Sequence, residues 1–170
     1  MLKYLDSYVT LAEVPDELSL CINIIDCPIH CKGCSEPWMW DTYKGEYPNN
    51  QVPKILDEGE LEMLINKNEG ITCVCFMGGD KSPEDINKLA EFIHDKYQYK
   101  INAGWYSGKA SLPKCIDYSS FRYVKLGPYY KDKGGLDNPN TNQKLYQYDK
   151  YYSGYTIGKG WRDITYKFRK

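Results

Sequence analysis

The stretch LSLCINIIDCPIHCKGC, residues 18–34, decides how this chain is expected to fold. Its first part, residues 18–25, is rich in β-branched side chains and predicts a strand. A loop over residues 26–50 follows directly, and Cys27 stands near its start. The predicted strand therefore delivers a cysteine-bearing loop to one edge of the sheet that it joins.

Apolar runs and amphipathic stretches alternate along the rest of the chain, which predicts an α/β fold with right-handed crossovers. Residues 71–77, ITCVCFM, are almost all apolar, as in a strand buried on both faces of a parallel sheet. The other predicted elements are a helix over 52–66 that Gly59 interrupts, a helix from the N-cap Ser82 to 96, strands over 100–106 and 121–127, a glycine-rich loop over 133–142, and weakly extended structure over 144–168.

Composition and charge are those of an ordinary globular domain. The chain has 170 residues, and 22 basic against 23 acidic side chains give a net charge of −1. This balance gives no electrostatic reason to expect a nucleic acid or an anionic membrane as a partner. The N-terminal residues lack the pattern of a signal peptide, and no segment approaches the ~18 apolar residues of a membrane span. We expect one cytoplasmic domain over residues 1–170, with a Tyr-rich C-terminal extension from about 144.

Seven cysteines are present, and three of them, Cys27, Cys31 and Cys34, are close together in sequence. In a cytosolic chain such a cluster indicates a metal rather than disulfides. Three thiolates can hold one iron–sulfur cluster and leave an iron open, since a fully protein-ligated cubane takes four. A structural zinc site, with His30 or a distant cysteine as fourth ligand, and inert or redox cysteines are the alternatives. The other cysteines stand in apolar surroundings: Cys21, Cys73, Cys75 and Cys115.

Gly78, Gly79 and Asp80 follow the predicted strand over 71–77 without a gap. Glycines at the end of a strand let a ligand approach the backbone, and carbonyls or a carboxylate there can accept hydrogen bonds from an ammonium group. Chemistry in α/β folds lies beyond the carboxyl ends of the strands, so this motif and the cysteine loop are predicted at the same edge. A plain turn is the alternative interpretation.

Cys-x3-Cys-x2-Cys after the first predicted strand is the signature of the radical S-adenosylmethionine superfamily, which this chain resembles. It is similar in particular to the activating proteins of anaerobic ribonucleoside-triphosphate reductases. The likeness extends with gaps from about Pro15 to the C-terminus, and its segments are LCINIIDCPIHCKGCSEPWMWD, FMGGD, GWYSGK, VKLGPY, GGLDNPNTNQKLY and DITYKF.

The resemblance implies a [4Fe-4S] cluster ligated by Cys27, Cys31 and Cys34, with S-adenosyl-L-methionine bound to the open iron. An electron from the reduced cluster would cleave the sulfonium and give a 5′-deoxyadenosyl radical. That radical would abstract hydrogen from a glycine of the anaerobic ribonucleotide reductase large subunit, the expected protein partner. A flavodoxin- or ferredoxin-type protein would donate the electron. The implied fold is a short, incomplete (β/α) barrel, because a full eight-fold barrel needs about 250 residues.

Several residues are implied as contacts of the cofactor. Gly33 takes the place where most of the superfamily has an aromatic residue, as reductase activases often do, so the adenine needs another platform. Asp80 replaces a more usual Glu, which makes the backbone of Gly78 and Gly79 the stronger prediction. The further candidates are Ser35, Trp38 and Trp40 near the adenine, and Ser107 and Lys125 for the carboxylate or ribose.

Each of these candidates also has an ordinary structural interpretation: loop packing for the tryptophans, a turn hydroxyl for Ser107, and a solvated strand lysine for Lys125. The glycine-rich loop is expected to order the open face of the barrel or to meet the partner. The alternative functions are activation of another glycyl-radical enzyme, radical chemistry on a small molecule, and a non-catalytic interaction module in which a metal serves as a structural staple.

Overall fold

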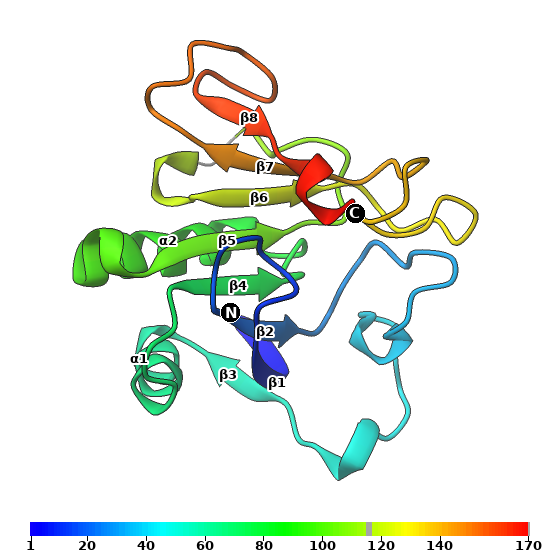
Figure 1. Ribbon diagram of the computed structural model, residues 1–170. Helices are drawn as coiled ribbons and strands as arrows, with labels where there is room; N and C mark the ends of the chain where they lie inside the picture. Colours follow the sequence, from blue (N-terminus) through cyan, green and yellow to red (C-terminus); the bar gives the residue numbers. More distant parts are fainter. Residues whose placement is uncertain (115–116, 170) are drawn as a thin grey trace.

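The described residues form one eight-stranded mixed sheet with two α-helices, which confirms the predicted α/β class (Figure 1). The computed structural model describes residues 1–114 and 117–169, so Cys115 lies outside the described part. The strand order is β3-β1-β2-β4-β5-β6-β7-β8. The strands are β1 (Leu2–Thr10), β2 (Ser19–Ile24), β3 (Lys54–Leu56), β4 (Cys73–Met77), β5 (Asn102–Tyr106), β6 (Tyr123–Leu126), β7 (Lys144–Tyr148) and β8 (Trp161–Asp163).

The centre of the sheet is parallel and its two sides are antiparallel. Strands β2, β4, β5 and β6 run parallel to one another, with Cys21 opposite Cys75 and Met77 opposite Tyr106. Strands β1 and β3 extend one side, and β7 and β8 extend the other, all through antiparallel pairs. Among the described strands, β3 and β8 form the two edges of the sheet and do not pair with each other.

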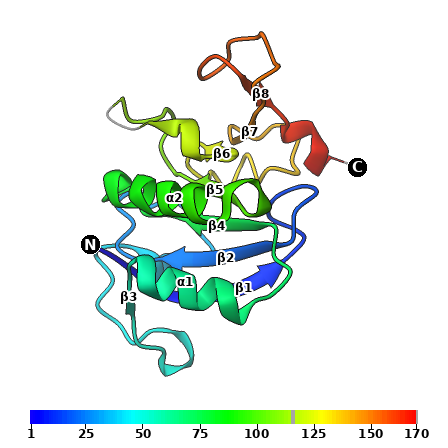
Figure 2. The same ribbon diagram turned by 90° about the vertical axis from the view of Figure 1, so that its left-hand side faces the viewer.

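Both α-helices cover the same face of the sheet (Figure 2). Helix α1 (Glu58–Lys67) and helix α2 (Pro83–Tyr97) bury an apolar stripe against alternate strand residues such as Ile22, Phe76 and Trp105. Alternate residues of a strand point to opposite faces, so the side chains between these ones, including Cys21 and Cys75, enter a second core on the far face. Val14 and Ile164 cover that second core.

The N-terminal half differs from the sequence predictions in two places. Strand β1 was not predicted, although it makes the long antiparallel pair with β2. The predicted helix over 52–66 is wrong in its first part, where β3 pairs Leu56 with Leu2. The helix begins only at Glu58, because Asp57 caps it by accepting a hydrogen bond from the Glu60 N–H at 2.9 Å. Gly59 lies within the first turn and does not break α1.

The C-terminal stretch belongs to the same sheet. The prediction of extended structure over 144–168 is confirmed for β7 and β8, but it is wrong for the last residues, which form a 3-10 turn, η5 (Thr165–Phe168). The Thr165 hydroxyl accepts a hydrogen bond from the Leu145 N–H at 2.9 Å, which holds this turn against β7. The other 3-10 turns are η1 (Pro37–Met39), η2 (Pro48–Asn50), η3 (Gln98–Lys100) and η4 (Tyr118–Ser120).

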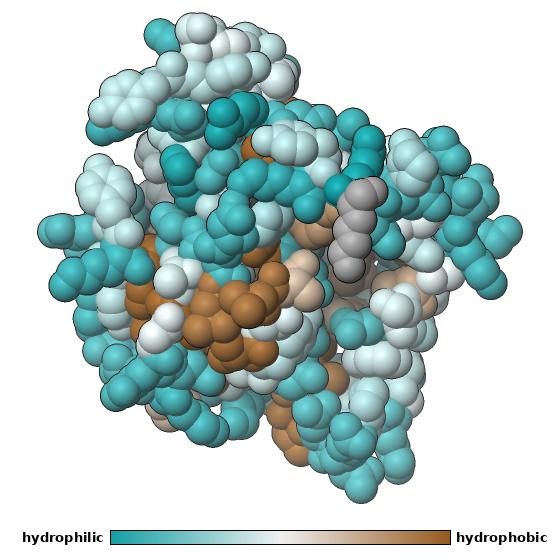
Figure 3. Space-filling model, in the orientation of Figure 1, coloured by the Kyte–Doolittle hydropathy of each residue, from teal (hydrophilic) through white to brown (hydrophobic). Residues whose placement is uncertain are grey.

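The face seen in Figure 3 is mostly hydrophilic, with apolar residues gathered in one area near its middle. Exposed apolar side chains of the chain include Val9 and Leu11 at the turn between β1 and β2. Such residues are common on protein surfaces and assign no function alone. Within the described residues, no helix combines the length and apolar character that crossing a membrane requires.

Candidate functional site

The cysteine loop leaves the carboxyl end of β2 and is closed at its base. The Cys27 N–H donates to the Met39 carbonyl at 2.7 Å, and the Asp41 N–H donates to the Cys27 carbonyl at 3.1 Å. These two bonds form a short parallel bridge between Cys27 and Trp40. Figure 1 shows the loop extending from β2 toward the connection between β6 and β7. The sequence prediction of a cysteine loop at this edge is therefore confirmed in position.

Backbone N–H groups approach the sulfur atoms of this loop. The Tyr129 N–H, from the β6–β7 connection, donates to Cys31 Sγ at 3.3 Å, and the Glu36 N–H donates to Cys34 Sγ at 3.4 Å. Burial raises the pKa of the Cys27 thiol, and hydrogen bonds from the backbone of Ile29 and His30 act against that rise. N–H donors stabilise the charge of a thiolate, which is the form that binds metals.

The three cysteines are half-buried and none is in a disulfide. Within the described part of the chain, no three His, Cys, Asp or Glu side chains lie close enough together to hold a single metal ion. His30, the alternative fourth ligand of a zinc site, has a partner of its own: its Nε2 lies 2.6 Å from Asp41 Oδ1.

The residues between and after the cysteines meet the neighbouring loop. Gly33 has φ +85°, and a Cβ built there would lie 3.0 Å from the Cβ of Lys131. Only glycine fits this backbone and this approach without strain. Ser35 lies exposed on the loop, and the Trp40 ring packs against His30 with ring centroids 5.2 Å apart. This contact is the loop packing that the alternative interpretation of Trp40 predicts.

The Gly-Gly-Asp motif lies at the carboxyl end of β4, beside the end of β2. Gly78 and Gly79 have φ of +103° and +84°, and a Cβ on Gly78 would lie 3.0 Å from the Ile24 carbonyl oxygen. The Gly78 carbonyl accepts a hydrogen bond from Trp105 Nε1 at 2.7 Å. A carbonyl oxygen has two lone pairs, so this one retains capacity for a second donor.

Asp80 is buried and already has partners within the protein. Its Oδ1 accepts from the Ser107 hydroxyl at 2.5 Å, and its Oδ2 accepts from the Gly108 N–H at 2.9 Å. Asp80 therefore ties the loop after β5 to the end of β4. The structure brings the predicted residues Asp80 and Ser107 together, in a contact with each other.

Lys125 is buried on β6, with 9% of its surface exposed, so its interpretation as a solvated strand lysine is wrong. Its Nζ donates to the Gly127 carbonyl at 2.8 Å. Burial lowers the pKa of Lys125 to about 8, and the nearby Cys31, Asp80 and Cys27 act in the opposite direction. A cation is thus placed beside two of the three predicted ligand cysteines.

Sequence reasoning missed other residues of this region. Glu13 is half-buried; burial raises its pKa, while nearby Lys125 lowers it. Gln143, at the end of the glycine-rich loop, is buried and its Nε2 donates to the Gly127 carbonyl at 3.3 Å. No local motif marks Glu13, because the fold alone brings the β1–β2 connection to Lys125. The Gln143 bond links the end of the glycine-rich loop to the residue that follows β6.

We compared the chain with protein-family models, with curated proteins and with solved structures, and none of the three comparisons found a match. The family resemblance therefore depends on the motifs themselves, and the arguments below depend on the geometry of the residues that carry them.

Proposed function

We propose that this chain is a radical S-adenosylmethionine enzyme that activates an anaerobic ribonucleoside-triphosphate reductase in the cytoplasm. The observation that carries the proposal is the position of the Cys27, Cys31 and Cys34 loop. It lies at the carboxyl edge of the parallel strands, beside Gly78 at the end of β4 and Lys125 on β6. Thiol ligands, a carbonyl with a free lone pair at Gly78 and the buried Lys125 at one edge are what such a cofactor pair needs.

The donor set suits a [4Fe-4S] cluster. Cys27, Cys31 and Cys34 are unpaired thiols on one loop, and the N–H groups of Tyr129 and Glu36 point at two of their sulfur atoms. Hydrogen bonds of this type tune the reduction potential of iron–sulfur clusters. Three protein ligands leave one iron for S-adenosylmethionine. A cluster of several irons also spaces its ligands more widely than a single ion does.

The chain's own residues would bind and orient the nucleotide cofactor. The Gly78 carbonyl, which has one lone pair left, would accept a hydrogen bond from the ammonium group of S-adenosylmethionine, while the missing Cβ atoms of Gly78 and Gly79 leave room for Ile24 and Ile86. Lys125 supplies positive charge near the site of its carboxylate. Asp80 and Ser107 act as positioning residues, because they hold the loop after β5 and have used their hydrogen bonds on each other.

Cys27, Cys31 and Cys34 would hold the cluster, which when bound and reduced would supply the electron for splitting S-adenosylmethionine into methionine and a 5′-deoxyadenosyl radical. The protein must keep water and oxygen away from that radical while admitting a glycine of the partner. Unpaired sheet edges at β3 and β8 leave the described sheet open, which suits a substrate that is a loop of another protein.

The test is anaerobic reconstitution with iron and sulfide, reduction with dithionite, and measurement of 5′-deoxyadenosine after S-adenosylmethionine is added. The wild type should form it and Cys31→Ala should not, while Cys73→Ala, at a buried cysteine of the second core, should retain the reaction. A glycyl radical signal on added reductase would establish the partner. Stoichiometric zinc without cleavage would instead favour the non-catalytic metal-stapled module, and cleavage without reductase activation would favour another glycyl-radical enzyme.

A further inference from the structure

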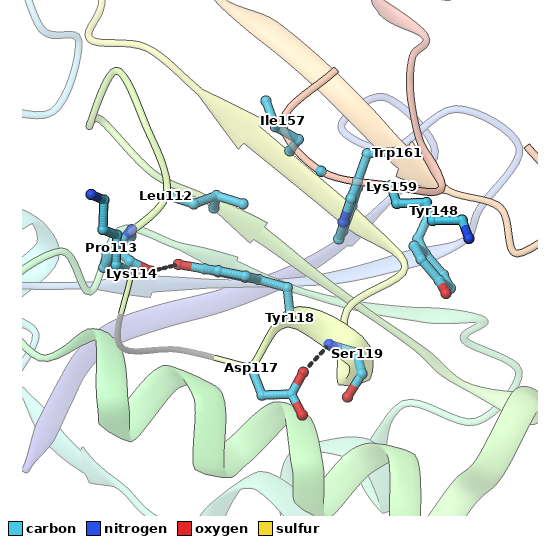
Figure 4. Close-up of a pocket in the computed structure, with 11 residues that line it drawn as sticks. Leu112, Pro113, Lys114, Asp117, Tyr118, Ser119, Tyr148, Ile157, Lys159 and Trp161 are labelled. Atoms are coloured by element: carbon cyan, nitrogen blue, oxygen red, sulfur yellow. Dashed lines mark hydrogen bonds between the residues drawn. The ribbon is translucent and has the colours of Figure 1, made fainter. Parts of the chain in front are cut away.

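A cavity lies near the amino end of β6, away from the cysteine loop at the carboxyl ends of the parallel strands. It has a volume of about 380 Å³ and lies between the connection that follows β5 and the connection between β7 and β8 (Figure 4). Tyr148 at the end of β7 lies near the amino end of β6, because Tyr123 pairs with Gln147. The volume is within the range of about 300–1,000 Å³ that small-molecule sites occupy.

Aromatic and aliphatic side chains form the walls of this cavity. Trp161 and Tyr148 meet with ring centroids 5.5 Å apart and an angle of 60° between the rings. Tyr118, Leu112 and Ile157 complete the apolar lining, and Figure 4 shows Trp161 between Ile157 and Tyr118. Walls of this kind bind flat apolar groups, because rings offer large contact areas with little loss of conformational freedom.

The Trp161 indole Nε1 makes no hydrogen bond to another described residue, and the residue as a whole is 5% exposed. The hydroxyl of Thr156 donates to the Trp161 carbonyl at 2.6 Å and so fixes the backbone of this residue. Because Trp161 lines the cavity, its Nε1 is a donor available to a molecule inside it.

The charged residues of the cavity are two lysines and one aspartate. Lys114 and Lys159 both line it and both are exposed, so their ammonium groups can move toward a ligand. The Asp117 carboxylate accepts a hydrogen bond from the Ser119 N–H at 2.9 Å and caps η4. The cavity therefore has an excess of positive charge and of hydrogen-bond donors, which complements an anion.

We infer that this cavity binds a small aromatic anion. Its ring would lie among Trp161, Tyr118 and Tyr148, and its carboxylate or phosphate oxygens would accept hydrogen bonds from Trp161 Nε1 and the lysines. The site is separate from the cysteine loop and needs neither the cluster nor S-adenosylmethionine. It would be present whether or not the proposed function is correct.

Calorimetric titration of the full chain with two probes tests this site. Adenosine monophosphate represents a phosphate anion on an aromatic base, and indole-3-acetate represents a carboxylate anion. At least one should bind, and its neutral counterpart, adenosine or indole-3-acetamide, should bind about tenfold more weakly, because a charge-assisted hydrogen bond is lost. The anion that binds with the higher affinity shows whether the site prefers a phosphate or a carboxylate.

Variants locate the binding. Trp161→Phe keeps a ring but removes the N–H, and Lys159→Gln removes a charge. Each substitution should lower the affinity for the probe that binds by about tenfold. Lys150→Gln is the matched control, since Lys150 is on the same connection but lies over the Tyr151 ring and outside the cavity lining. If Trp161→Phe fails to fold, as judged by circular dichroism, Lys159→Gln alone decides. Absence of binding at millimolar concentration, or binding that both variants leave unchanged, overturns the inference.

Discussion

The Ser107 hydroxyl donates a hydrogen bond to Asp80 Oδ1 at 2.5 Å, and both residues are buried. This contact joins the carboxyl ends of β4 and β5, and the Gly108 N–H, 2.9 Å from Asp80 Oδ2, strengthens it. Through these contacts Asp80 supports the predicted site. The strength of the contact between Asp80 and Ser107 can be measured as a change in the free energy of unfolding.

We expect Asp80→Ala to lower the free energy of unfolding by about 2–4 kcal/mol, because it leaves the buried Ser107 hydroxyl and the half-buried Gly108 N–H unpaired. Ser107→Ala should lower the free energy of unfolding by about 1 kcal/mol. The double variant should lower it by less than the sum of the two single losses. Urea denaturation measures all three. Ser153→Ala, at an exposed serine, should change nothing. Additive losses would show that the two side chains do not depend on each other.

Gly78→Ala should destabilise the protein more than Gly70→Ala. Both residues have positive φ, so alanine costs about 1–2 kcal/mol at either position. A Cβ at Gly70 has no atom within 4 Å, whereas one at Gly78 lies 3.0 Å from the Ile24 carbonyl oxygen. This crowding against the backbone should lower the free energy of unfolding of Gly78→Ala by about 1–3 kcal/mol more than that of Gly70→Ala. Denaturation midpoints of the two variants give the difference, and equal losses would exclude the close approach of β4 to β2.

Stability should fall as pH rises above about 10, the usual pKa of tyrosine. Burial raises the pKa of Tyr106 well above that value, and nearby Cys75 and Glu13 add to the rise. The folded state therefore keeps a proton that the unfolded state loses, so unfolding is favoured at high pH. The contribution of Tyr106 is fully present below pH 10 and disappears as pH approaches the folded-state pKa.

Tyr106→Phe should reduce this slope of stability against pH by up to about 1.4 kcal/mol per pH unit. The measurement is urea denaturation at several pH values between 9 and about 11.5, compared with wild type. Tyr151→Phe, whose side chain is 85% exposed, serves as the control and should leave the slope unchanged. An unaltered slope in Tyr106→Phe would mean that this hydroxyl meets water in the folded state.

Ile164→Ala should cost about 2–4 kcal/mol, because Ile164 is fully buried in the second core, on the face away from the helices. The neighbouring Tyr166 is 60% exposed, so Tyr166→Ala should stay within about 0.5 kcal/mol of wild type. Thermal or urea unfolding compares the two. A small effect of Ile164→Ala would show that the C-terminal turn contributes little to covering this face.

The sequence by itself predicted the parallel centre of the fold and the edge at which the candidate site lies. Local patterns are sufficient there: the apolar run of β4 indicates a doubly buried strand, and Pro83 with Ser82 before it marks the start of α2. The spacing of Cys27, Cys31 and Cys34 is likewise local, because a short loop holds these residues near one another in any fold.

Only the tertiary structure decided what surrounds those elements. Strand β1 exists because it pairs with β2 and strand β3 because it pairs with β1, and no local period of their sequences requires it. Lys125 is buried, and Glu13 of the distant β1–β2 connection lies near it. Asp80 supports a loop because β4 and β5 are neighbours. Burial and pairing depend on contacts between segments far apart in the chain, so composition and spacing alone do not determine them.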